Sequence, residues 1–152
     1  MTNEIYAEEI RKLLDQYGKQ ENRICAMLGL ELIECDCECE EPYADFLFEP
    51  KEWMLNPYDG VHGGLICSAF DTCMGTGALA LRRDFISTTD ITISYIKAMT
   101  GKRQRIHCEY TQVGKRLIRI MAKAIDMDTG LLSATAMASF TVIKAQGNGL
   151  KV

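Results

Sequence analysis

The sequence NPYDGVHGGLICSAFDTCMGTGALALRR, residues 56–83, begins as a loop and continues as an apolar helix. Two turn signals, Asn56–Pro57 and Asp59–Gly60, argue against any helix before about Val61. From Gly64 onward, apolar residues recur at spacings of three and four, which is the helical period. Small and apolar residues cover nearly the whole circumference of this helix, so we predict that it is buried.

Two glycines lie inside the predicted helix, at Gly75 and Gly77. Each disfavours a helix by roughly 1 kcal/mol relative to alanine, so we expect their small size to allow close packing against a sheet. The same helix carries one carboxylate, Asp71, flanked by apolar residues such as Phe70 and Met74. We expect Asp71 to be largely buried, which is unfavourable unless the group is paired or functional. Asp71 is therefore either a functional group or the partner of a loop or a basic side chain.

The start of the helix offers hydrogen-bond donors. Gly63 and Gly64 leave first-turn N–H groups uncovered, and these groups with the helix dipole can polarise a carbonyl or hold an anion, as in an oxyanion hole. Gly63 and Asp71 are eight positions apart, or roughly 12 Å along a helix. One small reacting group cannot reach both in a single chain. If both serve one reaction, we expect a dimer with paired sites at its interface.

The segments before this helix predict helices and then strands. Residues 4–17 form an amphipathic surface helix, and residues 21–28 form a short second helix that ends at Gly29. Residues 30–40 and 43–48 alternate in polarity and predict two paired strands. In the first strand, Cys35, Cys37 and Cys39 recur at every second position, and we interpret them as small apolar residues facing the core rather than as metal ligands.

After the helix, short turns separate four segments of alternating polarity. Their apolar faces run over residues 91–95, 106–110, 118–124 and 132–142. This pattern predicts an antiparallel meander, and its many alanines leave room for an apolar helix. We predict an α+β chain in which a curved antiparallel sheet wraps around one central long helix, with N-terminal helices outside it.

Length and composition set further limits. The 152 residues fit one domain, which we divide into an N-terminal helical segment (1–29), a single domain (30–145) and a C-terminal tail (146–152). A net charge of −4 argues against a general nucleic-acid binder. The seven cysteines are odd in number and contain no Cys-x-x-Cys pair, which argues against a disulfide framework. We find neither a continuous apolar run of about 20 residues nor a signal peptide, so we expect a cytoplasmic protein without membrane contact.

Asn56, residues 60–64 (GVHGG) and Asp71 together resemble the hallmark of hotdog-fold thioesterases of the phenylacetyl-CoA thioesterase type. The likeness extends over about residues 28–143. It implies a hotdog fold. It also implies an enzyme that hydrolyses an acyl or aryl thioester of coenzyme A without a metal, in which coenzyme A is part of the substrate. It also implies a homodimer with interfacial sites and a dimer of dimers, or homotetramer. The fold also serves dehydratases and ligand sensors, so it does not settle the activity.

The resemblance assigns catalytic roles to four residues. The thioester carbonyl would be polarised by the Gly63 N–H and the Asn56 side-chain amide, while Asp71 of the partner subunit acts as general base or as nucleophile. Thr88 falls where the family often has a hydroxyl that holds the water. Thr88 shares strand parity with polar residues opposite the apolar face, so it reaches the site only if that face lies at the dimer interface or a β-bulge intervenes.

The resemblance also suggests residues that contact the substrate. His62 and Gly64 belong to the loop and the helix start, and in the family pattern the imidazole fixes the loop by bonding to backbone. Basic residues at helix and strand ends could hold the coenzyme A phosphates, and among them Arg116 is the first choice. The full set is Arg82, Arg83, Lys97, Lys102, Arg103, Lys115 and Arg116.

Alternatives remain at this stage. The chief one is a non-catalytic acyl-CoA binding protein, although such a protein needs no carboxylate at the thioester. An enoyl-CoA hydratase-like enzyme would pair an Asp and a His in a loop before the helix, which this sequence fits less well. Trp53 and Met54 either line an acyl pocket or pack under the loop. His107 falls on a polar strand face and suggests no special role, and the acyl group and its carrier stay open.

Overall fold

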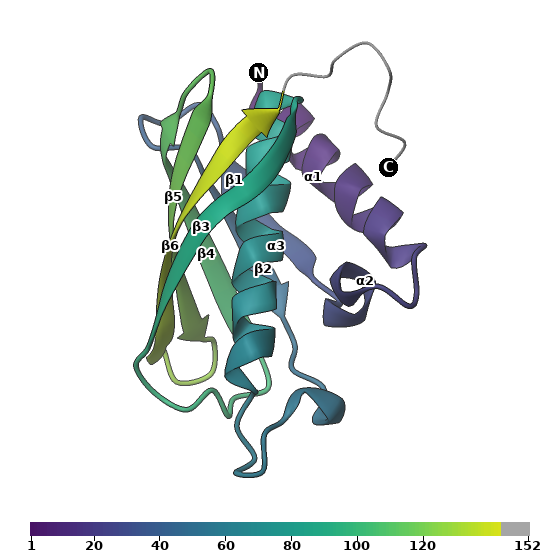
Figure 1. Ribbon diagram of the computed structural model, residues 1–152, viewed down its shortest axis with the longest axis vertical. Helices are drawn as coiled ribbons and strands as arrows, with labels where there is room; N and C mark the ends of the chain where they lie inside the picture. The colour runs from purple at the N-terminus through teal and green to yellow at the C-terminus, as the bar shows by residue number, and fades with distance from the viewer. Residues whose placement is uncertain (144–152) are drawn as a thin grey trace.

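A computed structural model describes residues 1–143, and the predicted tail at 146–152 lies outside this described part. A curved antiparallel sheet wraps around one long helix, α3 (Gly63–Arg82), and the helices α1 (Asn3–Gly18) and α2 (Ile24–Leu28) lie on the other side of α3 (Figure 1). The strands are β1 (Glu31–Asp36), β2 (Tyr43–Phe48), β3 (Phe85–Tyr95), β4 (Gln104–Val113), β5 (Leu117–Asp126) and β6 (Leu132–Ile143). The predicted α+β hotdog fold is confirmed.

The strand order is β1-β2-β4-β5-β6-β3, with every pair antiparallel. We had predicted that the four strands after α3 form one continuous meander, and this prediction is wrong. Strand β3 pairs with β6, while β4 joins β2, because the connection at residues 96–103 carries the chain from an edge of the sheet to its middle. This connection is longer than the tight turns of the true meander β4-β5-β6.

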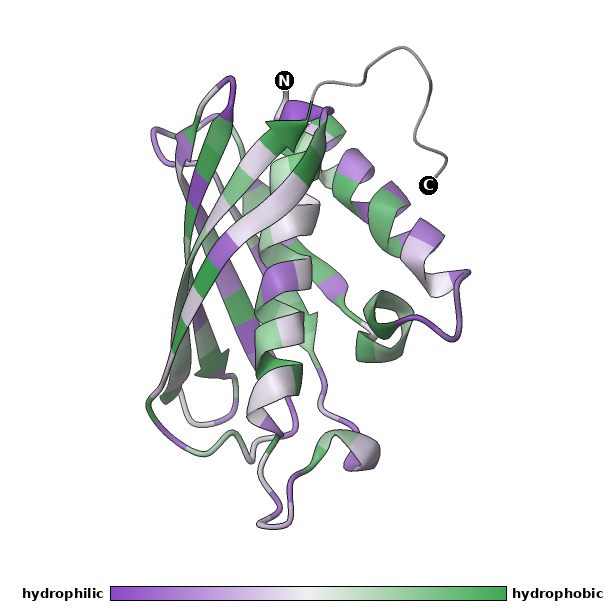
Figure 2. Cartoon of the chain, in the orientation of Figure 1, coloured by the Kyte–Doolittle hydropathy of each residue, from purple (hydrophilic) through white to green (hydrophobic). Residues whose placement is uncertain are grey.

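The core lies between α3 and the concave face of the sheet. Figure 2 shows α3 as mainly apolar or neutral, whereas α1 carries both hydrophilic and hydrophobic residues. Alanines on β5 and β6 leave the space that α3 occupies, as predicted; they are Ala122, Ala124, Ala134, Ala136 and Ala138, all buried. Among the described helices, α3 is long and apolar enough to cross a bilayer, with 56% of its most apolar stretch buried inside the fold.

The two helical glycines allow the predicted close approach. A Cβ atom on Gly77 would lie 1.7 Å from the Tyr110 hydroxyl of β4, and one on Gly75 would lie 3.3 Å from the Phe140 ring of β6. The α1 helix docks beside this point through Tyr6, which is fully buried next to Tyr110. Gly77 is thus the position where α1, α3 and the sheet come closest.

The strand predicted for residues 30–40 is wrong at its end, because β1 stops at Asp36. The Asp36 carboxylate accepts hydrogen bonds from the N–H groups of Glu38 at 2.8 Å and Cys39 at 3.2 Å. A short side chain that bonds nearby backbone in this way favours a turn over a strand. Cys37 and Cys39 consequently leave the strand, and Cys39 is exposed.

Two smaller predictions also change. The helix predicted from about residue 21 begins at Ile24. The segment predicted as a loop before Asn56 contains a short 3-10 helix, Glu52–Met54. Met54 packs fully buried under this loop, whereas the Trp53 side chain is exposed. Of the two roles considered for them, packing fits Met54.

Candidate active site

Asp71 lies in the middle of α3 and is only partly buried, less than the sequence predicts. The Thr88 hydroxyl of β3 donates a hydrogen bond of 2.8 Å to the Asp71 carboxylate. The register between β3 and β6 shifts between Thr88 and Asp90, which is a β-bulge. A bulge inverts the alternation of a strand, so Thr88 faces the helix although Asp90 does not. Of the two explanations considered for Thr88, the structure therefore shows the β-bulge, which brings the Thr88 hydroxyl to Asp71 of the same chain.

The Asp71–Thr88 pair lies in a cavity of about 320 Å³ between α3, α1 and the beginning of β3. Its other lining residues are Tyr17, Cys25, Thr72, Gly75, Thr76, Leu79, Ile86, Ser87 and Phe140. Within residues 1–143, no basic side chain forms an ion pair with Asp71. The carboxylate is therefore available to a ligand or a water in this cavity, and its structural role as a partner of a basic residue loses support.

Asn56 organises the loop before α3. Its side-chain oxygen accepts hydrogen bonds from the backbone N–H groups of Tyr58 at 2.8 Å and Gly60 at 3.3 Å. The backbone N–H of Asn56 donates to the Gly60 carbonyl at 2.7 Å. The amide oxygen is thus committed to the loop. The amide nitrogen has no acceptor among the described residues, so it remains a donor held in a fixed orientation.

The first turn of α3 presents one open donor rather than two. The Gly64 N–H donates to Nδ1 of His62 at 3.0 Å, so His62 caps the helix and a neutral imidazole must carry its proton on Nε2. The Gly63 N–H has no acceptor within residues 1–143. The Tyr95 hydroxyl donates to the Gly63 carbonyl at 2.8 Å, and a Cβ on Gly63 would lie 3.2 Å from the Tyr95 ring. Sequence reasoning missed this contact.

Asn56 and Gly63 share a second cavity, also of about 320 Å³. Its other lining residues are Val61, Ile66, Tyr95, Ile96, Lys97, Ala98 and Met99. It has no residue in common with the Asp71 cavity. The donors and the carboxylate therefore lie in two separate cavities of one chain, which we call the two half-sites, in agreement with the spacing of roughly 12 Å along α3.

The predicted phosphate-binding residues lie in different places. Arg82 pairs with Asp84 at 2.6 Å and Arg83 with Glu9 at 3.4 Å, both at the C-terminal end of α3. Arg116 is exposed in the β4–β5 hairpin, which lies toward the same end of the molecule (Figure 1). Lys97 is the basic residue that lines the cavity of the two donors.

The two cysteines of α3 are poor nucleophiles in this structure. Burial raises the pKa of the Cys67 thiol, and the nearby Asp71 charge raises it further. Burial also raises the pKa of Cys73 well above its usual range. Because the thiolate is the reactive form, these shifts disfavour cysteine catalysis.

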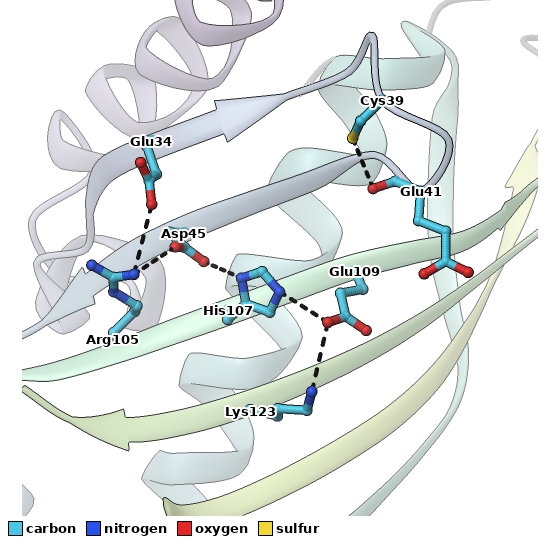
Figure 3. Close-up of polar contacts among 8 residues, drawn as sticks. All are labelled: Glu34, Cys39, Glu41, Asp45, Arg105, His107, Glu109 and Lys123. Carbon is cyan, nitrogen blue, oxygen red and sulfur yellow. Dashed lines mark hydrogen bonds and ion pairs between the residues drawn. The ribbon is translucent and has the colours of Figure 1, made fainter. Parts of the chain in front are cut away.

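His107 has a role that the sequence did not suggest. Figure 3 shows it on β4 between two carboxylates: Nδ1 contacts Asp45 of β2, and Nε2 lies 3.0 Å from Glu109. Asp45 is 2% exposed and also contacts Arg105 at 3.3 Å. The hydrogen bond that His107 donates to the Asp45 carboxylate raises the pKa of His107, and burial opposes this shift. The cluster joins β2 and β4, and none of its residues lines either half-site cavity.

Comparison with known proteins places the chain in a family. The model of the thioesterase superfamily matches residues 58–133, half of the chain. The chain belongs to the thioesterase superfamily. The match covers Gly63, Asp71 and Thr88, and begins just after Asn56. No curated protein matches this thioesterase-superfamily chain.

Solved structures share the fold at low sequence identity. The PaaI protein of the E. coli phenylacetic acid degradation operon aligns with a TM-score of 0.73 and 17% identity, over 90% of this chain and 95% of its own. A thioesterase family protein from Silicibacter pomeroyi gives a TM-score of 0.75 and 17% identity, over 92% and 99%. Zebrafish thioesterase superfamily member 2 gives 0.73 and 13%, over 88% and 98%. These likenesses establish the fold of the thioesterase-superfamily chain.

Proposed function

We propose that this protein is an acyl-CoA thioesterase whose active site is completed by two copies of the chain. The observation that carries the proposal is the separation of two half-sites on one superfamily chain: Asn56 and Gly63 in one cavity, Asp71 and Thr88 in another. In a homodimer, the interface would bring the donors of each subunit to the carboxylate of the other, which gives two equivalent sites. Two such dimers could assemble further into a tetramer.

In the proposed reaction, the thioester carbonyl oxygen accepts hydrogen bonds from the Gly63 N–H and the Asn56 amide. Asp71 of the partner subunit takes a proton from a water that Thr88 positions, and the water oxygen bonds to the carbonyl carbon. The carbon–sulfur bond of the resulting oxyanion then breaks, and the thiolate leaves and is protonated. Oxyanion donors of this kind contribute about 10²–10³ in rate and a positioned base about 10²–10⁴. Direct attack by Asp71 would use the same geometry.

The coenzyme A portion would lie on basic side chains around the site. Lys97 is best placed because it lines the cavity that holds both donors. Arg116 is exposed and has no carboxylate partner among residues 1–143, so it is the second choice. Arg82 and Arg83 each contact an acidic side chain and would have to exchange that contact for a phosphate.

Release of coenzyme A, followed with a chromogenic disulfide, tests the proposal on short, long and aromatic acyl-CoAs. We expect Asp71→Asn, which keeps the shape and the hydrogen bond to Thr88, to lower kcat by about 10²–10⁴. Asp15→Asn is the matched control, since Asp15 is a surface carboxylate on α1 paired only with Lys19. Acyl-CoA that raises the melting temperature without being cleaved would contradict hydrolysis and favour a binding protein.

A further inference from the structure

A further cavity of the described residues has no role in the reaction above. It has a volume of about 460 Å³ and lies between α1, the end of α3 and the beginning of β3. Its walls are apolar at Leu13, Leu79, Ala80 and Phe85. The charged residues Glu9, Arg83 and Asp84 also line it, and each of them is engaged in an ion pair. This open cleft has apolar walls with paired charges at its rim, which suits an apolar ligand.

This cavity continues the one that contains Asp71. The two cavities share Leu79, and residues of α1, α3 and β3 line both of them; Cys25 of α2 and Phe140 of β6 line only the one with Asp71. On α3, the lining residues Asp71, Gly75 and Leu79 are four positions apart, so they form one row along the helix, and Arg83 follows at the same spacing just after the helix ends. On α1, Glu9, Leu13 and Tyr17 form a facing row with the same spacing. Together they define one groove, which we call the α1 groove.

The α1 groove has a direction. The Arg83–Glu9 ion pair marks one end, and Asp71 and Tyr17 lie at the other, so α1 runs antiparallel to α3. From Asp71, the row reaches Leu79 after roughly 12 Å and Arg83 after roughly 18 Å. Gly75 has no side chain, and the Phe140 ring lies 3.3 Å from where its Cβ would be, so Phe140 forms the wall of the groove one turn after Asp71.

We propose that the α1 groove binds the acyl chain of the thioester, and that the preferred substrate is a linear acyl-CoA of about 9 to 14 carbons. An extended hydrocarbon advances by about 1.3 Å per carbon, so such a chain spans the distance from Asp71 to Leu79 or Arg83. An aryl group such as phenylacetyl would fill only the part next to Asp71. The Glu9–Arg83 pair at the far end would oppose longer chains, because they would bring apolar carbons against a charged pair. The inference rests on the proposed function.

The test compares kcat/KM for acyl-CoAs of 4, 8, 12 and 16 carbons and for phenylacetyl-CoA. We expect a rise of roughly a hundredfold or more from 4 to 12 carbons, as each buried methylene adds affinity, and a decline at 16. Leu13→Trp places an indole in the groove and should lower the ratio of the 12-carbon to the 4-carbon kcat/KM at least about tenfold. Glu9→Leu removes the Glu9–Arg83 ion pair and places an apolar side chain at the far end, so it should move the optimum toward longer chains. Asp15→Trp adds the same indole on the exposed face of α1 and serves as the control.

Three outcomes are separable. Hydrolysis that does not depend on chain length, or a Leu13→Trp variant that lowers all substrates equally, overturns the groove assignment while the thioesterase proposal stands. A shifted chain-length optimum in Glu9→Leu supports the assignment even if Leu13→Trp fails to fold, and an unshifted one counts against it. Absence of hydrolysis with every thioester overturns the proposed function itself.

Discussion

Replacing Gly77 with alanine should destabilise the protein, although alanine is the better helix former by about 1 kcal/mol. The added Cβ would lie 1.7 Å from the Tyr110 hydroxyl and 2.5 Å from the ring carbon that bears it. Tyr110 is 1% exposed, and Tyr6 lies on the other side of the same point, so neither ring can move into solvent. Overpacking of this kind costs about 3 kcal/mol, which leaves a net loss of about 2 kcal/mol.

For a chain of this size, that loss lowers Tm by about 4–8 °C. Thermal unfolding of wild type and Gly77→Ala at equal protein concentration measures it. Gly75→Ala is the matched control on the same helix, because its Cβ would lie 3.3 Å from Phe140 and needs a shift of only a few tenths of an ångström. We expect its Tm to be unchanged or raised by up to about 4 °C. A Gly77→Ala protein as stable as wild type would refute the packing described for α1, α3 and the sheet.

Three further predictions concern polar groups. Asn56→Asp keeps the oxygen that holds the loop but removes the amide donor, so kcat should fall about 10²–10³ in the thiol-release assay while Tm changes little; a large loss of Tm would point to a structural role only. Thr88→Val should lower kcat roughly tenfold or more, and Thr88→Ser should restore it, because the hydroxyl holds the water. A Thr88→Val protein with the kcat of wild type would contradict this role. The Asp45 contact raises the pKa of His107. The contribution of this contact to the free energy of unfolding should therefore be complete below about pH 6.5 and be lost as the pH rises through the folded-state pKa. Urea unfolding of wild type and His107→Gln from pH 5.5 to 9 measures this contribution. A difference in stability between the two proteins that does not change with pH would contradict the prediction.

Local signals in the sequence were sufficient for α3 and for the donor and carboxylate positions. The turn dipeptides and the helical period predicted a helix close to its observed bounds, Gly63–Arg82. The spacing between Gly63 and Asp71 already predicted that the two groups lie apart in one chain. These features depend on residues near one another in the sequence, where periodicity and geometry apply directly.

Features that depend on strand register could not be predicted in the same way. The β-bulge that turns Thr88 toward Asp71 was one of two open alternatives, because alternation alone places Thr88 on the polar side. The contact between Asp45 and His107 joins residues 62 positions apart and needs the β2–β4 register. The position of Tyr95 over Gly63 likewise depends on where β3 ends against the helix.

Subunit complementation tests the central claim most directly, since each variant would lack a different half of the site. Asp71→Asn and Asn56→Asp proteins are prepared separately, then unfolded together and refolded as a mixture, and thiol release is measured with the best acyl-CoA. Random assortment into dimers with shared sites restores both halves in about a quarter of the sites. We therefore predict that the mixture recovers about a quarter of wild-type activity while each variant alone stays nearly inactive. A mixture no more active than its components would show that the two half-sites do not meet between chains.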